Sequence, residues 1–229
     1  MNSQKAITGF DLLKFLMALV IINIHLNLVD YVDGMWLYIP WSYINDMAVP
    51  TFFILSSFFF FRKVWKGNND DKMQGLRHYE CRLAKLYLFW IVALSPIILY
   101  CWHPEYLTSS YFALFLFIKN FLFGYEFGAS WFFGALLVGV PVIFAIRKIS
   151  NGMIALLISL VVYIYLYVDM DRKLLCELYT NLLRDPKLSF PSGLLWISIG
   201  ATMSNVKFIE FIERSKLSLL ISGGQFRYS

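Results

Sequence analysis

Apolar runs long enough to cross a lipid bilayer recur along this chain and limit what it can fold into. A run of this kind matches the roughly 20 residues that a helix needs to span the hydrocarbon core, and it is too long for the alternating strands of a membrane β-barrel. The sequence therefore predicts an all-α, polytopic membrane helix bundle with about six to seven transmembrane helices. The runs fall at about 8–28, 43–61, 82–102, 130–146, 152–168 and 190–206, with a last one beginning near 217.

The composition agrees with a membrane protein. Of the 229 residues, 59% are hydrophobic and only 15% are charged, whereas a soluble domain carries roughly a quarter charged residues. The net charge of +5 does not indicate a nucleic-acid partner, because the basic residues gather in short segments between the apolar runs. The three cysteines show neither metal-ligand nor disulfide spacing, so no metal site is expected.

The charges of the loops predict an orientation. The connection 62–85 and the later turns near 147 and 207 are rich in lysine and arginine, whereas residues 29–42 contain neither. The positive-inside rule then places the N-terminus and the basic loops in the cytoplasm, although the loop 169–187 carries four basic residues on the predicted outer side. We interpret the short aromatic run 111–124 as an interfacial helix on the outer surface.

Polar residues in the first apolar run, "GFDLLKFLMALVIINIH", form one stripe. Lys14 and His25 are eleven residues apart, which on a helix returns to within about 20° of the start, about 16 Å further along the axis. Asp11 shares this face. Because a charge at mid-membrane costs on the order of 3 kcal/mol, such groups usually face protein or a watery cavity, and a histidine can exchange a proton near neutral pH. The stripe is therefore either a reaction track or a snorkelling Lys14 with an interfacial His25.

Three further segments carry candidate residues. In "RHYECRLAK", Arg82 and Lys85 share a helix face, where they could hold phosphates or anchor the helix in the inner leaflet. In "VPTFFILSSFFFF", Ser56 interrupts an aromatic run and suits a close helix contact. In "SWFFGALLVGVP", Trp131 opens a helix, where tryptophan is more often a membrane-belt residue than a ligand contact.

Taken in order, these segments resemble the membrane-bound acyltransferase 3 family. The first helix of that family is matched by "FDLLKFLMALVIINIH", the second by "FFILSSFF", the paired arginines of the third by "RLAK" and the start of the fourth by "WFFGAL". A later segment, "FPSGLLWISIGATMS", is similar to another family helix. The matches run through nearly the whole chain, which implies a single acyltransferase domain over residues 1–229.

The resemblance also implies a reaction and its residues. An acyl group, most often acetyl, would pass from a cytoplasmic acyl-CoA to a hydroxyl of an envelope polysaccharide or related acceptor at the bacterial inner membrane. The acyl-CoA is a co-substrate, so no permanently bound cofactor is expected. The residues implied are His25 as the catalytic group, Lys14, Arg82 and Lys85 as ligands of the donor phosphates, and Asp11, Ser56 and Trp131 in supporting roles.

The sequence departs from the family pattern at several points. Lys14 and Lys85 stand where the family has arginine, which keeps the charge but loses the bidentate fork, and Ser57 replaces a glycine. Family domains are also longer, so this chain is expected to lack a C-terminal third and could be inactive. An alternative is a non-enzymatic transporter or glycan-export component that uses the polar stripe as a proton or anion path.

Overall fold

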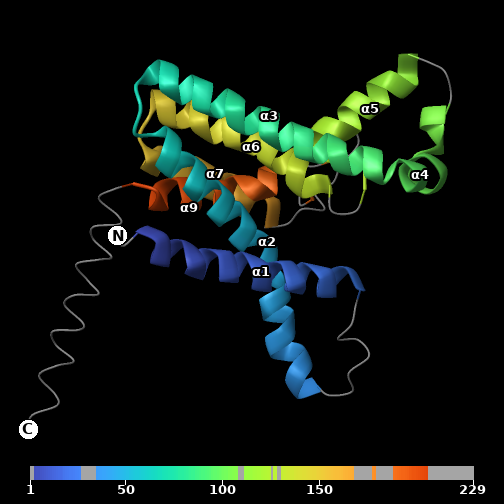
Figure 1. Ribbon diagram of the computed structural model, residues 1–229, viewed down its shortest axis with the longest axis horizontal. Coiled ribbons are helices and arrows are strands. Elements are labelled where there is room, and N and C mark those ends of the chain that lie inside the picture. The colour runs from blue at the N-terminus through green and yellow to red at the C-terminus, as the bar shows by residue number, and fades with distance from the viewer. Residues whose placement is uncertain are drawn as a thin grey trace, which may run out of the picture.

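The computed structural model describes residues 3–26, 35–107, 111–124, 126–127, 130–167, 177–178 and 188–205. Every regular element in these ranges is a helix, which confirms the predicted all-α bundle (Figure 1). The apolar run near 217 and most of the loop 169–187 lie outside the described residues. The elements are α1 (Ser3–Leu26), α2 (Met35–Val64), α3 (Asn69–Ala93), α4 (Ser95–Ile97), η2 (Ile98–Trp102), η3 (Pro104–Leu107), α5 (Tyr111–Phe123), α6 (Ser130–Ile149), α7 (Gly152–Tyr167) and α9 (Phe190–Met203).

The described helices include segments that can cross a membrane by length and composition. Two helical segments qualify as spans by themselves, Trp41–Val64 within α2 and Ser130–Ile149, which is α6. A third span would consist of α3 together with Ser95–Cys101, with a bend of 66° between them. α7 and α9 are apolar but shorter, with 16 and 14 residues. Two to three spans are therefore supported by these helices, and the larger predicted number of six to seven stays a prediction.

α3 begins well before the apolar run that was predicted to start at 82. Its first turn is closed by a capping box, in which the backbone N–H of Asp71 donates to Asn68 Oδ1 (2.9 Å) and the backbone N–H of Asn68 donates to Asp71 Oδ2 (3.2 Å). This local signal starts the helix at Asn69. As a result, the polar residues between 69 and 82 are helical and lie along the end of α2.

The chain turns sharply at the far end of α3. A bend of 66° separates α3 from the following helical segment, and Pro96 lies in the first turn after the bend. α5 then leads back toward α6 (Figure 1). With 13 residues α5 confirms the short helix predicted at 111–124. After it, Gly124 has a φ of 71°, and a Cβ there would overlap the backbone of Ser130 and Trp131.

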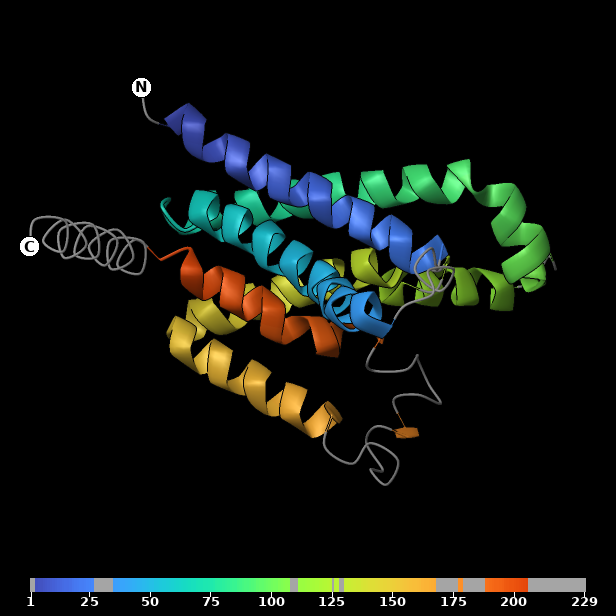
Figure 2. The same ribbon diagram turned by 90° about the horizontal axis from the view of Figure 1, so that it is seen from below.

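The two ends of the bundle differ in charge. The start of α1 and the connections α2–α3 and α6–α7 lie at one end, and α4 and α5 lie at the other (Figures 1 and 2). We call the first the basic end, because its residues include Arg62, Lys63, Lys66, Lys72, Arg147 and Lys148. The N-terminal helix start and two of the basic connections predicted to share one side of the membrane therefore lie at one end of the bundle, and the basic turn near 207 lies outside the described residues.

α9 is the central helix of the described bundle, in contact with α2, α6 and α7. Small residues allow this close packing, as is common between membrane helices. Gly200 of α9 lies directly against α2, where a Cβ would overlap Ser57 Oγ and the carbonyl oxygen of Ile54. The Ser57 hydroxyl is fully buried and donates to the carbonyl of Phe53 (2.8 Å) within its own helix. The α2–α9 contact thus depends on Gly200.

Arg147 joins three helices at the basic end. Its guanidinium carbon lies 4.9 Å from the ring centroid of Phe61 and 4.6 Å from that of Trp65, both near the end of α2. Its Nη1 also donates to the carbonyl oxygen of Ala201 in the last turn of α9. This arginine therefore holds α6, α2 and α9 together and satisfies a carbonyl at a helix end.

Replacing Gly200 with alanine is expected to destabilise the bundle. The new methyl group would overlap α2 backbone, which cannot move aside as a side chain can, and overpacking of this kind costs about 1 to 3 kcal/mol. Thermal unfolding of the purified protein in detergent measures the effect. Gly152→Ala is the control, because the nearest atom to its Cβ would be 3.6 Å away. Equal midpoints for the two variants would contradict the importance of the Gly200 contact.

Candidate functional site

A cavity of about 1140 Å³ lies between α2, α3 and α6 and is also lined by Lys14 of α1. We call it the inner cavity. Aromatic side chains of α2 and α6, including Phe59, Phe60 and Phe133, form much of its wall. Polar side chains of α3 from Asp71 to Arg82 line its other side. The cavity therefore combines an apolar interior with a charged face toward the basic end.

The charged face of the inner cavity favours anions. Lys14, Lys63 and Arg82 come from three different helices and line the same space, and Asp71 is the one carboxylate among the described lining residues. Basic side chains in such a cavity attract phosphates and form charge-assisted hydrogen bonds with them. The arrangement can hold a multiply charged ligand that also has an apolar part.

Lys14 is oriented by two contacts. Its Nζ lies 3.4 Å from Asp11 Oδ1, one turn away on α1, which confirms that these two residues share a helix face. The same Nζ lies 4.5 Å from the ring centroid of Phe59 on α2, a distance at which a cation and an aromatic ring attract. Asp11 thus lies on the same helix face as Lys14, as predicted, and Lys14 lines the inner cavity beside α2.

Ser56 links the two helices that form most of the inner cavity. Its Oγ is 2.9 Å from the hydroxyl oxygen of Tyr79, so α2 and α3 are joined by a hydrogen bond at the cavity wall. The Tyr79 ring also packs on Phe60, with 4.7 Å between the ring centroids. A supporting role for Ser56 is consistent with this position.

Three predicted site residues lie elsewhere. His25 is exposed in the last turn of α1, and Lys85 is exposed on α3, and neither is among the residues that line the inner cavity. Trp131 packs on Phe53, with 5.8 Å between ring centroids, and belongs to the hydrophobic core. Within the described chain, Lys14, Arg82 and Ser56 are therefore brought together, and His25, Lys85 and Trp131 are not.

The inner cavity also holds residues that the sequence did not single out. Lys63 looked like one more positive-inside charge, and His78 and Tyr79 precede the predicted start of the third apolar run. The signal that could have found His78 and Tyr79 is the capping box at Asn68, because a helix that starts there carries His78, Tyr79 and Arg82 on one side.

Comparison with known proteins identifies the family to which this sequence belongs. The acyltransferase 3 family model, described as an acyltransferase domain, matches residues 7–224. Searches of curated proteins and of solved structures give no match. The match includes α1 with Lys14 and His25, and α3 with Arg82, so the resemblance seen in the sequence is confirmed over nearly the whole chain. The chain belongs to the acyltransferase 3 family and is an acyltransferase.

Proposed function

We propose that the protein transfers an acyl group, in the first instance acetyl, from acyl-CoA to a hydroxyl of an envelope polysaccharide or related glycan. The observation that carries the proposal is the inner cavity, where Lys14 and Arg82 line one space although they lie far apart in the sequence. Both fall in the family motifs, and the family match supports acyl transfer. The acyl-CoA donor and the glycan acceptor follow from the resemblance to the family.

The inner cavity suits an acyl-CoA. The cations Lys14, Lys63 and Arg82 complement the phosphates of the nucleotide end, and the aromatic walls complement the less polar arm that carries the thioester. A volume of about 1140 Å³ exceeds the roughly 300 to 1,000 Å³ of pockets for drug-sized ligands. Lys85, one turn beyond Arg82 on α3, would add a further cation outside the lining.

In this proposal His25 is the catalytic base. It takes the proton of the acceptor hydroxyl while the oxygen attacks the thioester carbonyl, a C–O bond forms, the C–S bond breaks, and the CoA thiolate leaves. His25 lies about 16 Å from Lys14 along α1. A donor whose phosphates bind near Lys14 would therefore have to extend its arm along α1 to present the thioester to His25.

The same proposal includes an orientation of the protein in the membrane. The positive-inside rule places the basic end of the bundle in the cytoplasm, where acyl-CoA is made, and hence His25 toward the outer side. The expected location is the bacterial inner membrane, with several spans and a cytoplasmic N-terminus.

The His25→Ala variant is expected to lose acyl transfer while it still binds the donor. The reason is that the imidazole supplies the base, whereas the phosphates bind some 16 Å away. The measurements are transfer of radiolabelled acetyl from acetyl-CoA in membranes, and acetyl-CoA binding to the purified variant. His78→Ala is the matched control, because His78 lines the inner cavity and its loss should act on donor binding. Full transfer by His25→Ala would rule out the assigned role.

Arg82→Ala and Lys14→Ala are expected to weaken acetyl-CoA binding by roughly ten- to a hundredfold each, since each removes a charge-assisted contact worth about 1.5 to 3 kcal/mol. The binding should also become less sensitive to salt. Equilibrium binding at two ionic strengths measures both effects. Arg77→Ala provides the control, because Arg77 is exposed on α3 and does not line the inner cavity.

The Lys85→Ala variant tests the remaining predicted donor contact. An effect close to that of Arg82→Ala would support Lys85 as a ligand of the phosphates, and an effect close to that of Arg77→Ala would remove it from the site. If Arg82→Ala itself behaves like Arg77→Ala, the inner cavity is not the donor site.

A further inference from the structure

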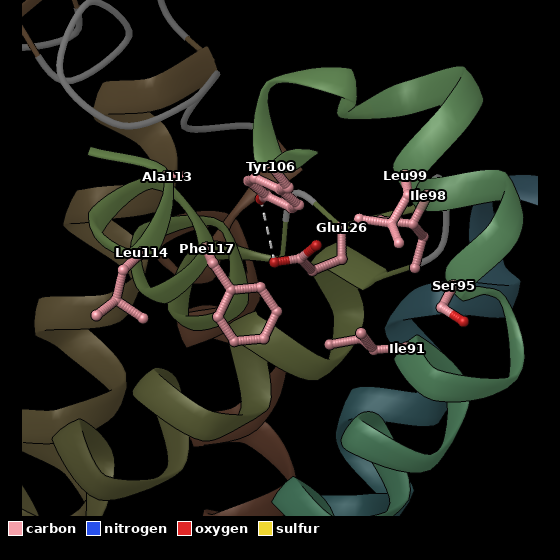
Figure 3. A pocket seen from close by; sticks show the side chains of 9 residues that line it. All are labelled: Ile91, Ser95, Ile98, Leu99, Tyr106, Ala113, Leu114, Phe117 and Glu126. Atoms are coloured by element: carbon pink, nitrogen blue, oxygen red, sulfur yellow. Dashed lines mark hydrogen bonds between the residues drawn. The ribbon is translucent and has the colours of Figure 1, made fainter. Parts of the chain in front are cut away.

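A second cavity, of about 280 Å³, lies at the end of the bundle opposite the basic end (Figure 3). We call it the outer cavity. It is lined by the end of α3, by the bent segment that follows, by α5 and by Glu126. Among the described residues that line it, none also lines the inner cavity and none is basic. The outer cavity is therefore a separate space with the opposite electrostatic character.

The polar centre of the outer cavity is Glu126. Its side chain is fully buried, and Figure 3 shows its carboxylate directed toward the Tyr106 hydroxyl and the Phe117 ring. Tyr106 Oη donates a hydrogen bond to Glu126 Oε1 (3.3 Å). Burying a carboxylate in a largely apolar surrounding is costly unless other groups hydrogen-bond to it.

The hydroxyl of Tyr106 has a fixed direction. Asn120, which is 5% exposed, donates from Nδ2 to Tyr106 Oη (2.6 Å), so the tyrosine proton is left to point at Glu126. The ring is held by stacking on His103 (centroids 4.9 Å apart) and by an edge contact with Phe117 (5.9 Å). These contacts fix the position of the Tyr106 hydroxyl beside the Glu126 carboxylate.

An aromatic stack separates the two cavities. The buried ring of Tyr87 lies between Phe133, a wall residue of the inner cavity, at 5.1 Å, and Phe121 at 4.7 Å, with interplanar angles of 4° and 14°. Phe121 in turn stacks on Phe117, a wall residue of the outer cavity. Each cavity can therefore hold its own ligand.

We propose that the outer cavity binds a single hydroxyl-bearing ring, of the size of one sugar unit, through hydrogen bonds to Glu126. A carboxylate that accepts one bond from Tyr106 can accept others from ligand hydroxyls, and the Phe117 ring offers an apolar face to the carbon side of a sugar. Because the described lining residues include a carboxylate and no basic side chain, they disfavour anionic ligands. The volume lies below the roughly 300 Å³ at which pockets for larger ligands begin.

The identification of that ring as part of the acceptor glycan rests on the proposed function, whereas the site itself does not. Direct binding is therefore tested first, without any donor. Saturation-transfer NMR of the full chain in lipid nanodiscs is recorded with D-glucose, N-acetyl-D-glucosamine and L-rhamnose, and with ethanolamine as a small cation. We expect a signal from at least one sugar, reduced by roughly tenfold or more in Glu126→Gln and by roughly threefold in Tyr106→Phe.

Tyr100→Phe is the matched control, because Tyr100 lies on the same bent segment but is 73% exposed. The sugar signal of this variant should equal that of the unmodified protein. The Tyr106→Phe variant keeps the aromatic ring at 106 and the carboxylate of Glu126. It therefore tests the site by itself if Glu126→Gln fails to fold. No sugar signal, a signal unaffected in the Tyr106 and Glu126 variants, or a signal from ethanolamine alone would overturn the proposal.

Acyl transfer from acetyl-CoA to the sugar that binds is then measured. Glu126→Gln should raise the KM for the sugar roughly tenfold and leave acetyl-CoA binding unchanged. Sugar binding that depends on Glu126 without any acyl transfer would reject the proposed function and keep the site. If acyl transfer occurs but sugar binding does not depend on Glu126, the site in the outer cavity is rejected and the proposed function is retained.

Discussion

The close contact of α9 with α2 determines where the other described helices can lie. Lipid is as apolar as a leucine side chain, so membrane helices associate through tight packing rather than through removal of apolar surface from water. Gly200 permits that packing against Ile54 and Ser57. Ser57 faces α9, while its neighbour Ser56 points about 100° away and bonds Tyr79 of α3. Two adjacent serines thus place α2 between α9 and α3, and the inner cavity opens on the side that α9 leaves free.

The lengths of the apolar runs and the order of the motifs predicted the all-α bundle and the shared helix face of Asp11 and Lys14. These features could be predicted because span length, loop charge and the α1 stripe are local properties. The grouping of Lys14 with Arg82 was predicted only through the family motifs, since no local pattern relates two residues on different helices. Lys63, His78 and Glu126 were missed for the same reason: their importance arises from what the fold places beside them. The start of α3 at Asn69 was not predicted, although its capping box is local, because the prediction followed the apolar run that begins at residue 82.

The lysine at position 14 has a physical explanation in this fold. Lysine is a compact point charge, so it loses the two parallel hydrogen bonds that an arginine could offer a phosphate. In return, its single Nζ contacts both Asp11 and the Phe59 ring, which fixes a flexible side chain at the inner cavity. These contacts place the ammonium group at the wall of the inner cavity, with 40% of the Lys14 side chain still exposed. The neighbouring Asp11 lowers the net positive charge at this end of the inner cavity.

The separation of the two cavities bears on the choice between transfer and transport. A transporter needs a path that can connect the two ends of the bundle, whereas a transferase needs two ligands that bind apart and meet at one reactive group. Along α3 the inner cavity ends near Leu86 and the outer cavity begins at Ile91, with Tyr87 stacked on both ring faces between them. Opening a passage here would require the loss of both stacking contacts of a fully buried ring. That cost argues against a conduit along α3, and it favours two separate ligand sites in this part of the bundle.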